Sequence, residues 1–574
     1  MFLTRAEDKG EAPFLWAKKD GEWRSISWNE AARQVAALAR SLRAIGLQPG
    51  DRVVLVSENR PEWLIADLAI MAAGCVTVPT YTTNTIRDHA HVLGNSSARA
   101  AIVSTQKLAR TLVPAVLTSS ECHHLIEIDD VRTGQASDEF TAHRWSQLIA
   151  GESGIGELRQ SLAGIGRNDL ACLIYTSGTG GAPRGVMQHH GAILHNVEGC
   201  VDIISSDFGW GDEVFLSFLP ASHAYEHTGG QHFPIGLGAQ IYYAESLDKL
   251  SANIEEVHPT IMVVVPRLFE LLRTRIMKVI EGGGSLSSYL LGRALKIGRD
   301  RYDRRFKPWD LPMDGFLNLT LRRKIRHKVG GRVKAWVSGG APLNPDVGVF
   351  FESLGITFLQ GYGQTEAAPL ISCNRPRDGI RLETVGKPVK NTEVRIAADG
   401  EIMVRGENVM YGYWRNPEET ARVLHDPGDG TGAWLATGDV GHFDDQGRIV
   451  ITDRKKDLIV NDKGDNVSPQ RIEGMLTLQP EIAQAMVFGD GRPHLVALLV
   501  PEPEFAQAPE LHKHLQQALD RVNADLSVFE KVRRFILADA PFTIENEQLT
   551  PSLKIRRHMI IAAYGDQLSA LYKR

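Results

Sequence analysis

The stretch "LIYTSGTGGAPRGV", residues 173–186, places a loop rich in glycine and hydroxyl groups directly behind an apolar run. The overlapping "DLACLIYT" predicts a buried strand and the later "HHGAILHNVEGCVDII" predicts a helix. Residues 176–185 are therefore expected to connect a strand to a helix, at the edge of an α/β sheet where ligands bind. Glycines let backbone N–H groups approach an anion. Hydroxyl donors and a fixed positive charge come from Thr176, Ser177, Thr179 and Arg184.

Read alone, this loop leaves two interpretations open. Its composition favours a phosphate-binding loop, but the G-x-x-x-x-G-K-S/T string of the common nucleotide loop is absent. An ordinary glycine-rich turn is the alternative. The rest of the chain has to decide between them.

Length and composition narrow the class of protein. A chain of 574 residues predicts two or more domains, and 43% apolar with 23% charged residues is typical of a soluble globular protein. A net charge of −5 argues against nucleic-acid binding. The five cysteines are scattered, which favours a reducing compartment without a disulfide framework or structural zinc.

The sequence predicts a cytoplasmic location. The N-terminal "MFLTRAEDKGEAP" has no signal-peptide pattern. The longest apolar run, "WLIADLAIMAAGCVTVP" at 63–79, contains Asp67 and is too short to span a bilayer. Contact with the inner face of a membrane stays open.

The order of strand and helix signals predicts the fold class. A serine cap at Ser27 precedes a helical pattern that ends at Gly46, and "DRVVLVSEN" then reads as a buried strand. Short β-branched runs continue to alternate with helices, which predicts a doubly wound α/β architecture. After about residue 380, Asp-Gly and Gln-Gly turns between alternating runs predict β-hairpins. From about Lys456 the pattern predicts a small α+β domain.

Four further stretches follow the opening loop in a fixed order. They are "GYGQTEAAP" (361–369), "WLATGDVGHFDDQGRIVITDRKKDLIV" (434–460), "KGDNVSPQRIE" (463–473) and "TPSLKIRR" (550–557). Together with "SGGAPL" (338–343), they make the chain resemble the adenylate-forming superfamily of acyl-CoA synthetases, luciferases and peptide-synthetase adenylation domains. This resemblance covers nearly the whole chain. It implies a large N-terminal domain of doubly wound sheets with a β-rich subdomain, residues 1–455, and a small mobile α+β lid domain, residues 456–574.

Finer details resemble the long-chain fatty acyl-CoA synthetase branch. They are "VPTYTTNT" at 78–85, "SFLPASHAYEHTGG" at 217–230, "PTIMVVVPRLFELL" at 259–272 and the insert between Glu281 and Gly331. The resemblance implies that ATP and a fatty acid give acyl-AMP and pyrophosphate, and that coenzyme A then displaces AMP. Mg²⁺ is the implied metal.

Roles for single residues follow from the resemblance as expectations. Thr176 to Thr179 and Arg184 would hold the β- and γ-phosphates of ATP, and Thr365 would face the α-phosphate. Glu366 and Thr176 would bind Mg²⁺. Asp439, supported by Arg454, would accept the ribose hydroxyls. Adenine would stack on Tyr362, with Gly340, Ala341 and Pro342 forming the opposite wall of its site. The other nucleotide-binding residues of these motifs are Ser177, Gly178, Gln360, Gly361 and Gly363.

Catalytic roles are implied for three side chains. Lys554 would bridge the carboxylate and the α-phosphate during adenylation, and Thr365 would assist at that phosphate. His223 resembles a position between the acyl tunnel and ATP, although a structural histidine is the alternative. Lys456 stands at the hinge position of the family, and the loop containing Gly464 would line a thiol channel.

The opening loop departs from the usual T-S-G-T-T-G-x-P-K-G, because Gly180 replaces a threonine and Arg184 a lysine. That departure leaves the phosphate contacts open. Two rival functions also stay open, a fatty acyl-AMP ligase that serves a carrier protein and a non-catalytic acyl- or nucleotide-binding protein. Chain-length preference is not predicted beyond the long-chain branch.

A basic segment at 293–334 carries 14 Lys and Arg against four Asp and Glu. A solvated helical face is the plain interpretation, and peripheral contact with an anionic membrane is the alternative. The expected partners are therefore a fatty acid, ATP and coenzyme A, without nucleic acid, with membrane contact and a homodimer as further hypotheses.

Overall fold

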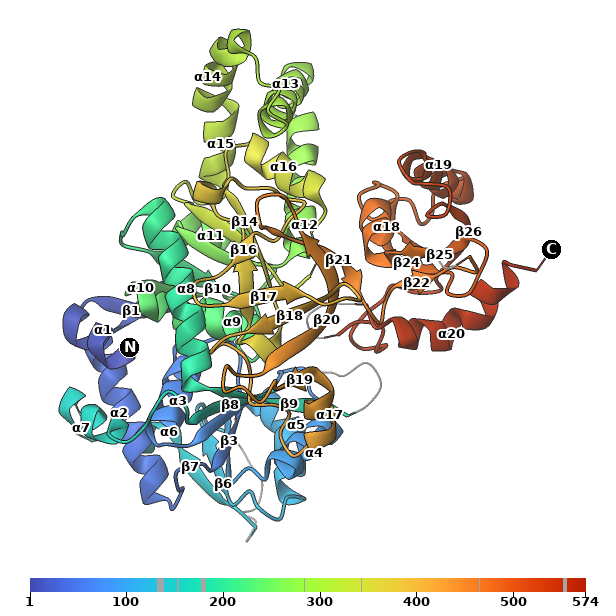
Figure 1. Ribbon diagram of the computed structural model, residues 1–574. Coiled ribbons are helices and arrows are strands. Elements are labelled where there is room, and N and C mark those ends of the chain that lie inside the picture. The colour runs from blue at the N-terminus through green and yellow to red at the C-terminus, as the bar shows by residue number, and fades with distance from the viewer. Residues whose placement is uncertain are drawn as a thin grey trace.

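The computed structural model describes residues 1–131, 139–151, 154–176, 182–282, 284–341, 343–463, 465–550 and 555–573. Two large sheets form the body of the molecule (Figure 1). In the first, the strands run in the order β7 (Thr141–Arg144), β6 (His124–Glu127), β5 (Ala100–Val103), β3 (Arg52–Val56), β4 (Val76–Pro79), β8 (Leu170–Thr176) and β9 (Arg184–His189). All neighbours in it are parallel except β8 and β9.

The second sheet has nine strands, with a parallel centre and antiparallel edges. Their order is β16 (Lys387–Pro388), β15 (Leu370–Cys373), β14 (Phe358–Gly363), β13 (Ala335–Ser338), β12 (Ile261–Val264), β10 (Val214–Ser217), β11 (Gln240–Tyr243), β1 (Pro13–Lys19) and β2 (Glu22–Ser27). The expected doubly wound α/β fold is thus confirmed.

Strand β3 shows why helices cover both faces of the first sheet. Val53 and Leu55 belong to the core under α2 (Trp28–Ala44) and α3 (Pro61–Ala72). Val54 and Val56 belong to the opposite core, under α4 (Ile86–Ser96) and α5 (Gln106–Leu117). Because side chains alternate along a strand, a run that is apolar throughout needs cover on both sides.

Residues 1–455 contain further helices besides those of residues 285–328. They are α1 (Phe2–Lys9), α6 (Trp145–Leu148), α7 (Ile155–Leu162), α8 (His190–Phe208), α9 (Ala224–Glu226), the π-helix η1 (His227–His232), α10 (Phe233–Leu237), α11 (Leu250–Val257), α12 (Pro266–Glu281), α16 (Pro345–Ser353), α17 (Pro417–Val423) and the 3₁₀ turns η3 (Thr365–Ala367) and η4 (Pro376–Asp378). The predicted cap at Ser27 is present, since its side chain accepts the Glu30 N–H at 3.1 Å.

The opening loop differs from its expected setting. Residues 184–189 form β9, which pairs antiparallel with β8 so that Thr176 lies opposite Arg184. The strands on either side of the loop are therefore antiparallel neighbours, and α8 begins only at His190. The expectation that residues 176–185 connect a strand directly to a helix was wrong. A short second strand, "RGVMQH", follows the glycine-rich stretch, and the helix begins only after that strand.

A β-rich part follows the two sheets. Its strands are β17 (Glu393–Ile396), β18 (Glu401–Arg405), β20 (Trp434–Phe443), β19 (Leu424–His425) and β21 (Ile449–Arg454), all antiparallel. The predicted hairpins around the Asp-Gly and Gln-Gly turns are present as β17–β18 and β20–β21.

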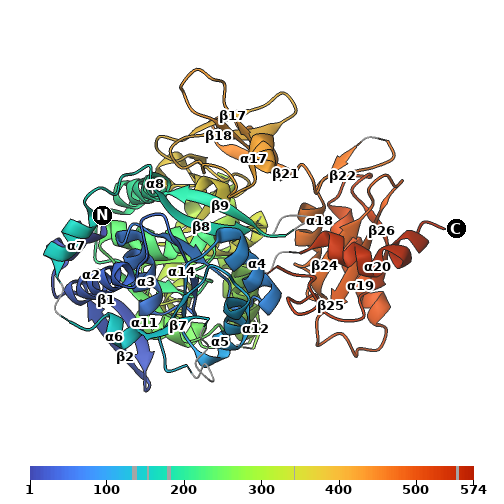
Figure 2. The same cartoon turned by 90° about the horizontal axis from the view of Figure 1, so that it is seen from below.

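The last part of the chain has its own cores and is set to one side of the body (Figure 2). Its elements are β22 (Ile459–Val460), β23 (Asn466–Val467), α18 (Pro469–Leu476), β24 (Ile482–Phe488), β25 (Leu495–Pro501), α19 (Leu511–Ala524), β26 (Val532–Leu537) and α20 (Arg557–Ala570). Both cores draw only on residues 459–572.

A group of helices projects beyond the second sheet, at the top of Figure 1. We call residues 285–328 the helical arm; it comprises α13 (Ser285–Tyr302), η2 (Pro308–Asp310), α14 (Leu311–Leu319) and α15 (Leu321–Lys328). Its small core contains Ala294, Ile297 and Leu317. Within the described ranges, no helix combines the length and apolar character that crossing a bilayer needs.

Candidate active site

Tyr362, Asp439 and Arg454 converge at the boundary between the second sheet and the β-rich part. The Tyr362 hydroxyl on β14 donates to Asp439 Oδ2 at 2.7 Å. Arg454 Nε donates to Asp439 Oδ1 at 3.2 Å, across the β20–β21 pair in which the two residues lie opposite each other. Carboxylate oxygens are acceptors of the kind to which ligand hydroxyl groups donate, so the residue type at position 439 suits a hydroxyl-bearing ligand.

Charge and burial set the protonation of this group. Burial, and then the charge of Asp439, raise the pKa of the Tyr362 hydroxyl well above its ordinary value. Burial is the largest single effect and would lower the pKa of Arg454, but the surrounding negative charges, those of Asp439, Asp457 and Glu366, together outweigh it and the pKa is raised. The phenol and the guanidinium therefore keep their protons and act as donors.

Glu366 lies beside this group and has a partner that was not predicted. The Tyr413 hydroxyl donates to Glu366 Oε1 at 2.8 Å. The Arg184 guanidinium stands 4.6 Å from the centre of the Tyr413 ring and donates to Glu419 Oε2 at 2.6 Å. Tyr413 thus contacts both Arg184, through its ring, and Glu366, through its hydroxyl group. The positive charge of Arg184 is paired with the carboxylate of Glu419.

Three buried side chains fix the turn that carries Thr365 and Glu366. Gln188 on β9 donates to the Thr365 carbonyl at 2.7 Å, and Asn196 on α8 donates to the Ala367 carbonyl at 3.1 Å. Thr228 of η1 donates to the next carbonyl, that of Ala368, at 2.9 Å. Donors from three elements hold this short turn, so its side chains have a defined position.

The ends of β13 and β14 offer unused polar atoms. Ser338 and Gln360 lie opposite each other in this parallel pair. Ser338 Oγ and Gln360 Oε1 are buried and have no hydrogen-bond partner among the described residues. Gly340 follows at φ +81°, a conformation that favours glycine, and the exposed Ala341 comes next. Unpaired buried groups at the carboxyl edge of parallel strands indicate a ligand site.

The glycines of "GYGQTE" are needed for packing. A Cβ atom on Gly363 would overlap the Pro369 carbonyl, and one on Gly361 would come within 3.3 Å of Leu370.

Lys456 is exposed in the turn after β21. Several predicted residues lie outside the described ranges, namely Ser177, Gly178, Thr179, Gly180, Pro342, Gly464 and Lys554.

His223 caps a helix. Its Nδ1 accepts the Tyr225 N–H at 3.2 Å at the start of α9. His189 caps α8 in the same way, by accepting the Ala192 N–H. Gly230 accommodates the Glu226 carboxylate, which a Cβ atom there would overlap. Burial raises the pKa of Glu226 to about 8.

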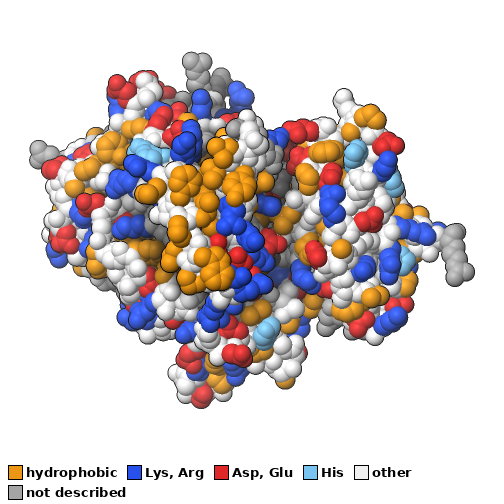
Figure 3. Space-filling view, turned by 90° about the horizontal axis from the view of Figure 1, so that it is seen from above, with side chains coloured by type: hydrophobic (Ala, Val, Ile, Leu, Met, Phe, Trp, Pro, Cys, Tyr) orange, Lys and Arg blue, Asp and Glu red, His pale blue; other side chains and the backbone are white. Residues whose placement is uncertain are grey.

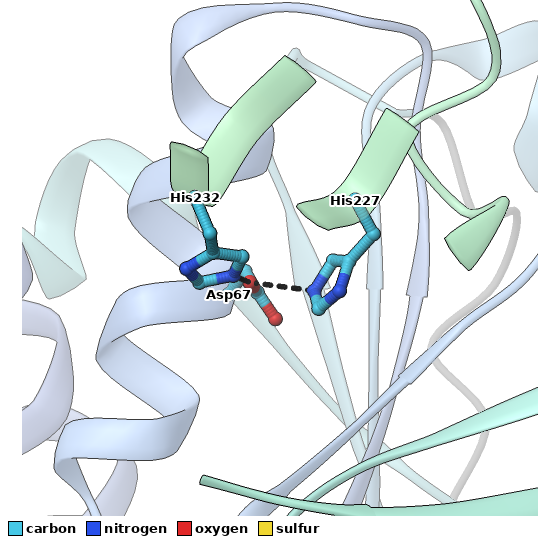
Figure 4. A group of neighbouring side chains, drawn as sticks. All are labelled: Asp67, His227 and His232. Atoms are coloured by element: carbon cyan, nitrogen blue, oxygen red, sulfur yellow. Dashed lines mark hydrogen bonds and ion pairs between the residues drawn. The ribbon is translucent and has the colours of Figure 1, made fainter. Parts of the chain in front are cut away.

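A buried trio, Asp67, His227 and His232, joins α3 to the π-helix η1 (Figure 4). Both imidazole Nε2 atoms lie 3.0 Å from Asp67 Oδ2. These three groups are close enough to hold a metal ion. Burial alone would raise the pKa of Asp67, but the two imidazoles hold it below its ordinary range, and burial lowers the pKa of His232. The carboxylate therefore accepts from both rings.

Sequence reasoning missed Tyr413, Glu419, Gln188 and Asn196. None belongs to a motif with a recognised spacing, and Tyr413 is 47 residues from the glutamate that it contacts. Whether a polar side chain is buried, and which distant residue it contacts, can be determined only when the fold is known.

Known proteins match this chain along most of its length. The profile of the AMP-binding enzyme family matches residues 2–414, and that of the AMP-binding enzyme C-terminal domain matches residues 456–574. The long-chain-fatty-acid–CoA ligase FadD15 of Mycobacterium tuberculosis is 31% identical over 97% of this chain and 93% of its own. The chloroplastic long-chain-fatty-acid–[acyl-carrier-protein] ligase AEE15 of Arabidopsis thaliana is 27% identical, over 95% of this chain and 82% of its own.

A solved structure shares the fold. The adenylation domain of a carboxylate reductase from Mycobacterium chelonae superposes with a TM-score of 0.75 at 23% identity, covering 100% of this chain and 90% of that one.

Proposed function

Because the chain belongs to the AMP-binding enzyme family, we propose that it is an acid–thiol ligase acting on fatty acids. The fatty-acid carboxylate attacks the α-phosphorus of ATP, which gives acyl-AMP and releases pyrophosphate. The thiol of coenzyme A then forms the thioester and releases AMP. The observation that carries this proposal is the Tyr362–Asp439–Arg454 group beside Glu366, in a chain 31% identical to a long-chain ligase.

The nucleotide would lie across the ends of β13 and β14. Asp439 would accept the ribose hydroxyls, with Arg454 and Tyr362 holding its carboxylate in place. Adenine would stack on Tyr362, with the segment of Gly340, Ala341 and Pro342 opposite. Gln360 and Ser338 offer polar atoms at this edge that have no hydrogen-bond partner within the described ranges.

The phosphates would lie between the β8–β9 hairpin and the turn of η3. Arg184 would exchange its partner Glu419 for phosphate, and Thr365 would face the α-phosphate. Glu366, with Thr176, offers the oxygen ligands that Mg²⁺ prefers, and the Tyr413 hydroxyl orients the Glu366 carboxylate. When bound, Mg²⁺ would neutralise phosphate charge during the displacement.

Lys554 is proposed to stabilise the developing charge between the carboxylate and the α-phosphate. It would belong to a lid domain, residues 456–574, that turns about Lys456 relative to residues 1–455. His223 is proposed to separate the acyl chain from the nucleotide, alongside its capping role.

The variant Lys554→Ala tests whether Lys554 acts in adenylation but not in thioester formation. We expect it to abolish pyrophosphate release while thioester formation from supplied acyl-AMP continues. Lys513→Ala is the matched control, because Lys513 is an exposed lysine of the same region, paired only with Glu510 among the described residues. Equal loss of both half-reactions in Lys554→Ala would contradict the assigned role.

The substrate and the acceptor are tested together. Pyrophosphate release measured with acids from acetate to oleate should be greatest with long chains, and the adenylate should pass to free coenzyme A. Preferred transfer to a carrier protein would favour the acyl-AMP ligase alternative. That alternative is tested because the relative AEE15 is named as a ligase for an acyl-carrier protein. No carboxylate-dependent pyrophosphate release would favour a binding protein. A homodimer and peripheral membrane contact through 293–334 stay proposals.

A further inference from the structure

The helical arm exposes an unusual amount of apolar surface. Seventeen large apolar side chains are exposed in the described chain, and six of them belong to this arm of 44 residues. The six are Leu286, Tyr289, Trp309, Leu311, Phe316 and Leu319. Figure 3 looks down on the end that carries the arm and shows hydrophobic side chains gathered in one patch with Lys and Arg at its edge. Such a patch marks an interaction surface.

Helix α14 has its apolar face turned outward. Five of its exposed positions follow the i, i+1, i+4, i+5, i+8 spacing of one helix face, and they are Leu311, Pro312, Gly315, Phe316 and Leu319; the exposed Asn318 lies at the border of this stripe. The buried positions of α14, Asp314 and Leu317, face the arm. A solvated surface helix carries polar residues on its outer face, and α14 carries none within this stripe.

Basic side chains surround this face. Of the 14 Lys and Arg between 293 and 334, several form ion pairs inside the protein, such as Arg301 and Arg322 with Asp314. Others are exposed and have no acidic partner among the described residues: Lys296, Arg304, Lys307, Arg323 and Lys324. An apolar helix face bordered by exposed cations is complementary to an anionic lipid surface.

A cavity of about 240 Å³ opens beside Trp309. Arg293, Lys296 and Lys307 line it together with Asp300 and Asp310. Arg293 donates to Asp310 at 3.1 Å, but its buried Nε has no partner among the described residues. The cavity therefore offers cationic donors, next to an exposed indole, to a lipid phosphate.

We propose that the helical arm docks on the surface of an anionic lipid bilayer, with Trp309 and the outer face of α14 inserted and the surrounding Lys and Arg against lipid phosphates. This inference rests on the proposed function in one respect, that fatty acids partition into bilayers and a docked ligase would meet its substrate there. The docking itself depends only on the arm.

Two matched double variants test the insertion. Trp309→Ser/Leu319→Ser removes side chains that are 73% and 72% exposed on the arm, and Trp210→Ser/Leu247→Ser removes side chains that are 62% and 67% exposed elsewhere. Co-sedimentation is measured with vesicles of phosphatidylcholine alone and with 30% phosphatidylserine. We expect the full chain to bind the anionic vesicles, more weakly at high salt. The arm variant should bind them at least tenfold more weakly, and the control variant like the unchanged protein.

Activity with a short water-soluble acid is measured on the same samples. Unchanged pyrophosphate release in the arm variant would show that it is folded, and vesicle binding would stand even if no acid were activated. Equal binding by both double variants, equal binding to neutral vesicles, or no binding by the unchanged chain would overturn the proposal. If the unchanged chain is a dimer that does not bind vesicles, and the arm variant is a monomer, this face would instead be the contact with a second copy of the chain.

Discussion

Removing one hydroxyl group tests whether Glu366 is held for metal binding. Tyr413→Phe keeps the buried ring under Arg184 but deletes the donor that reaches Glu366 Oε1 at 2.8 Å. The carboxylate would then be free to rotate away from the position that Mg²⁺ requires. The expected primary effect is on the metal, with little change in folding.

The size of the effect follows from the type of hydrogen bond. A hydrogen bond to a charged group contributes about 1.5 to 3 kcal/mol, which corresponds to about 10- to 150-fold. Changes to residues that orient a metal ligand weaken metal binding by about 10- to 100-fold. We therefore expect the Mg²⁺ concentration for half-maximal pyrophosphate release to rise by about 10- to 100-fold.

The assay is a Mg²⁺ titration of pyrophosphate release at saturating ATP and fatty acid. Tyr411→Phe is the matched control, since its hydroxyl donates to the Asn168 carbonyl at 2.9 Å and its ring stacks on His189. Thioester formation from supplied acyl-AMP should be unaffected in both variants. An unchanged Mg²⁺ requirement in Tyr413→Phe, or an equal change in both variants, would refute the reasoning.

Three further outcomes are expected. Glu226 has a pKa of about 8 in the fold against 4.5 ordinarily, so its contribution to stability is complete below about pH 4.5 and is lost as the pH rises to 8, by at most about 5 kcal/mol. Urea unfolding at pH 5, 6.5 and 8 should show this decline, and Glu226→Gln should flatten it. Asp67→Leu leaves two buried imidazoles unpaired and should lower the free energy of unfolding by about 2 to 5 kcal/mol, whereas Asp67→Asn keeps an acceptor and should cost less than half of that. Asp439→Asn should raise the KM for ATP at least about tenfold with a smaller change in kcat, because it weakens ground-state nucleotide binding; a reversed pattern would contradict a ribose contact.

The sequence predicted those features whose signal is local. Apolar runs such as residues 52–56 identified the central strands, and the turns at Asp399–Gly400 and Gln446–Gly447 identified the hairpins. Grouping of Tyr362, Asp439 and Arg454 was predicted from the resemblance alone, because no spacing rule joins residues 77 positions apart.

Features that depend on distant partners were not predictable. Strand β9 exists because Met187 and its neighbours pair with β8 and with the segment near Gly412, across a loop that reads as glycine-rich coil. Asp67 meets His227 from 160 positions away, and in the sequence it interrupts an apolar helix without a visible reason. The outward face of α14 also has the composition of a buried helix, so only the structure shows it to be exposed.

The position of Arg454 at the last residue of β21 has a mechanical consequence. Directly after it, the Lys455 N–H donates to the Gly438 carbonyl and its ammonium pairs with Asp399 and Glu401, so the chain is anchored to the β-rich part just before Lys456. A rotating body displaces each atom in proportion to its distance from the axis. If the lid turns about Lys456, a sugar bound at Asp439 stays with residues 1–455 and lies close to the pivot, so the nearby part of the lid shifts little relative to it, while groups at the far end of the lid sweep through a wide arc. One nucleotide contact can then persist through two reactions that need different lid positions.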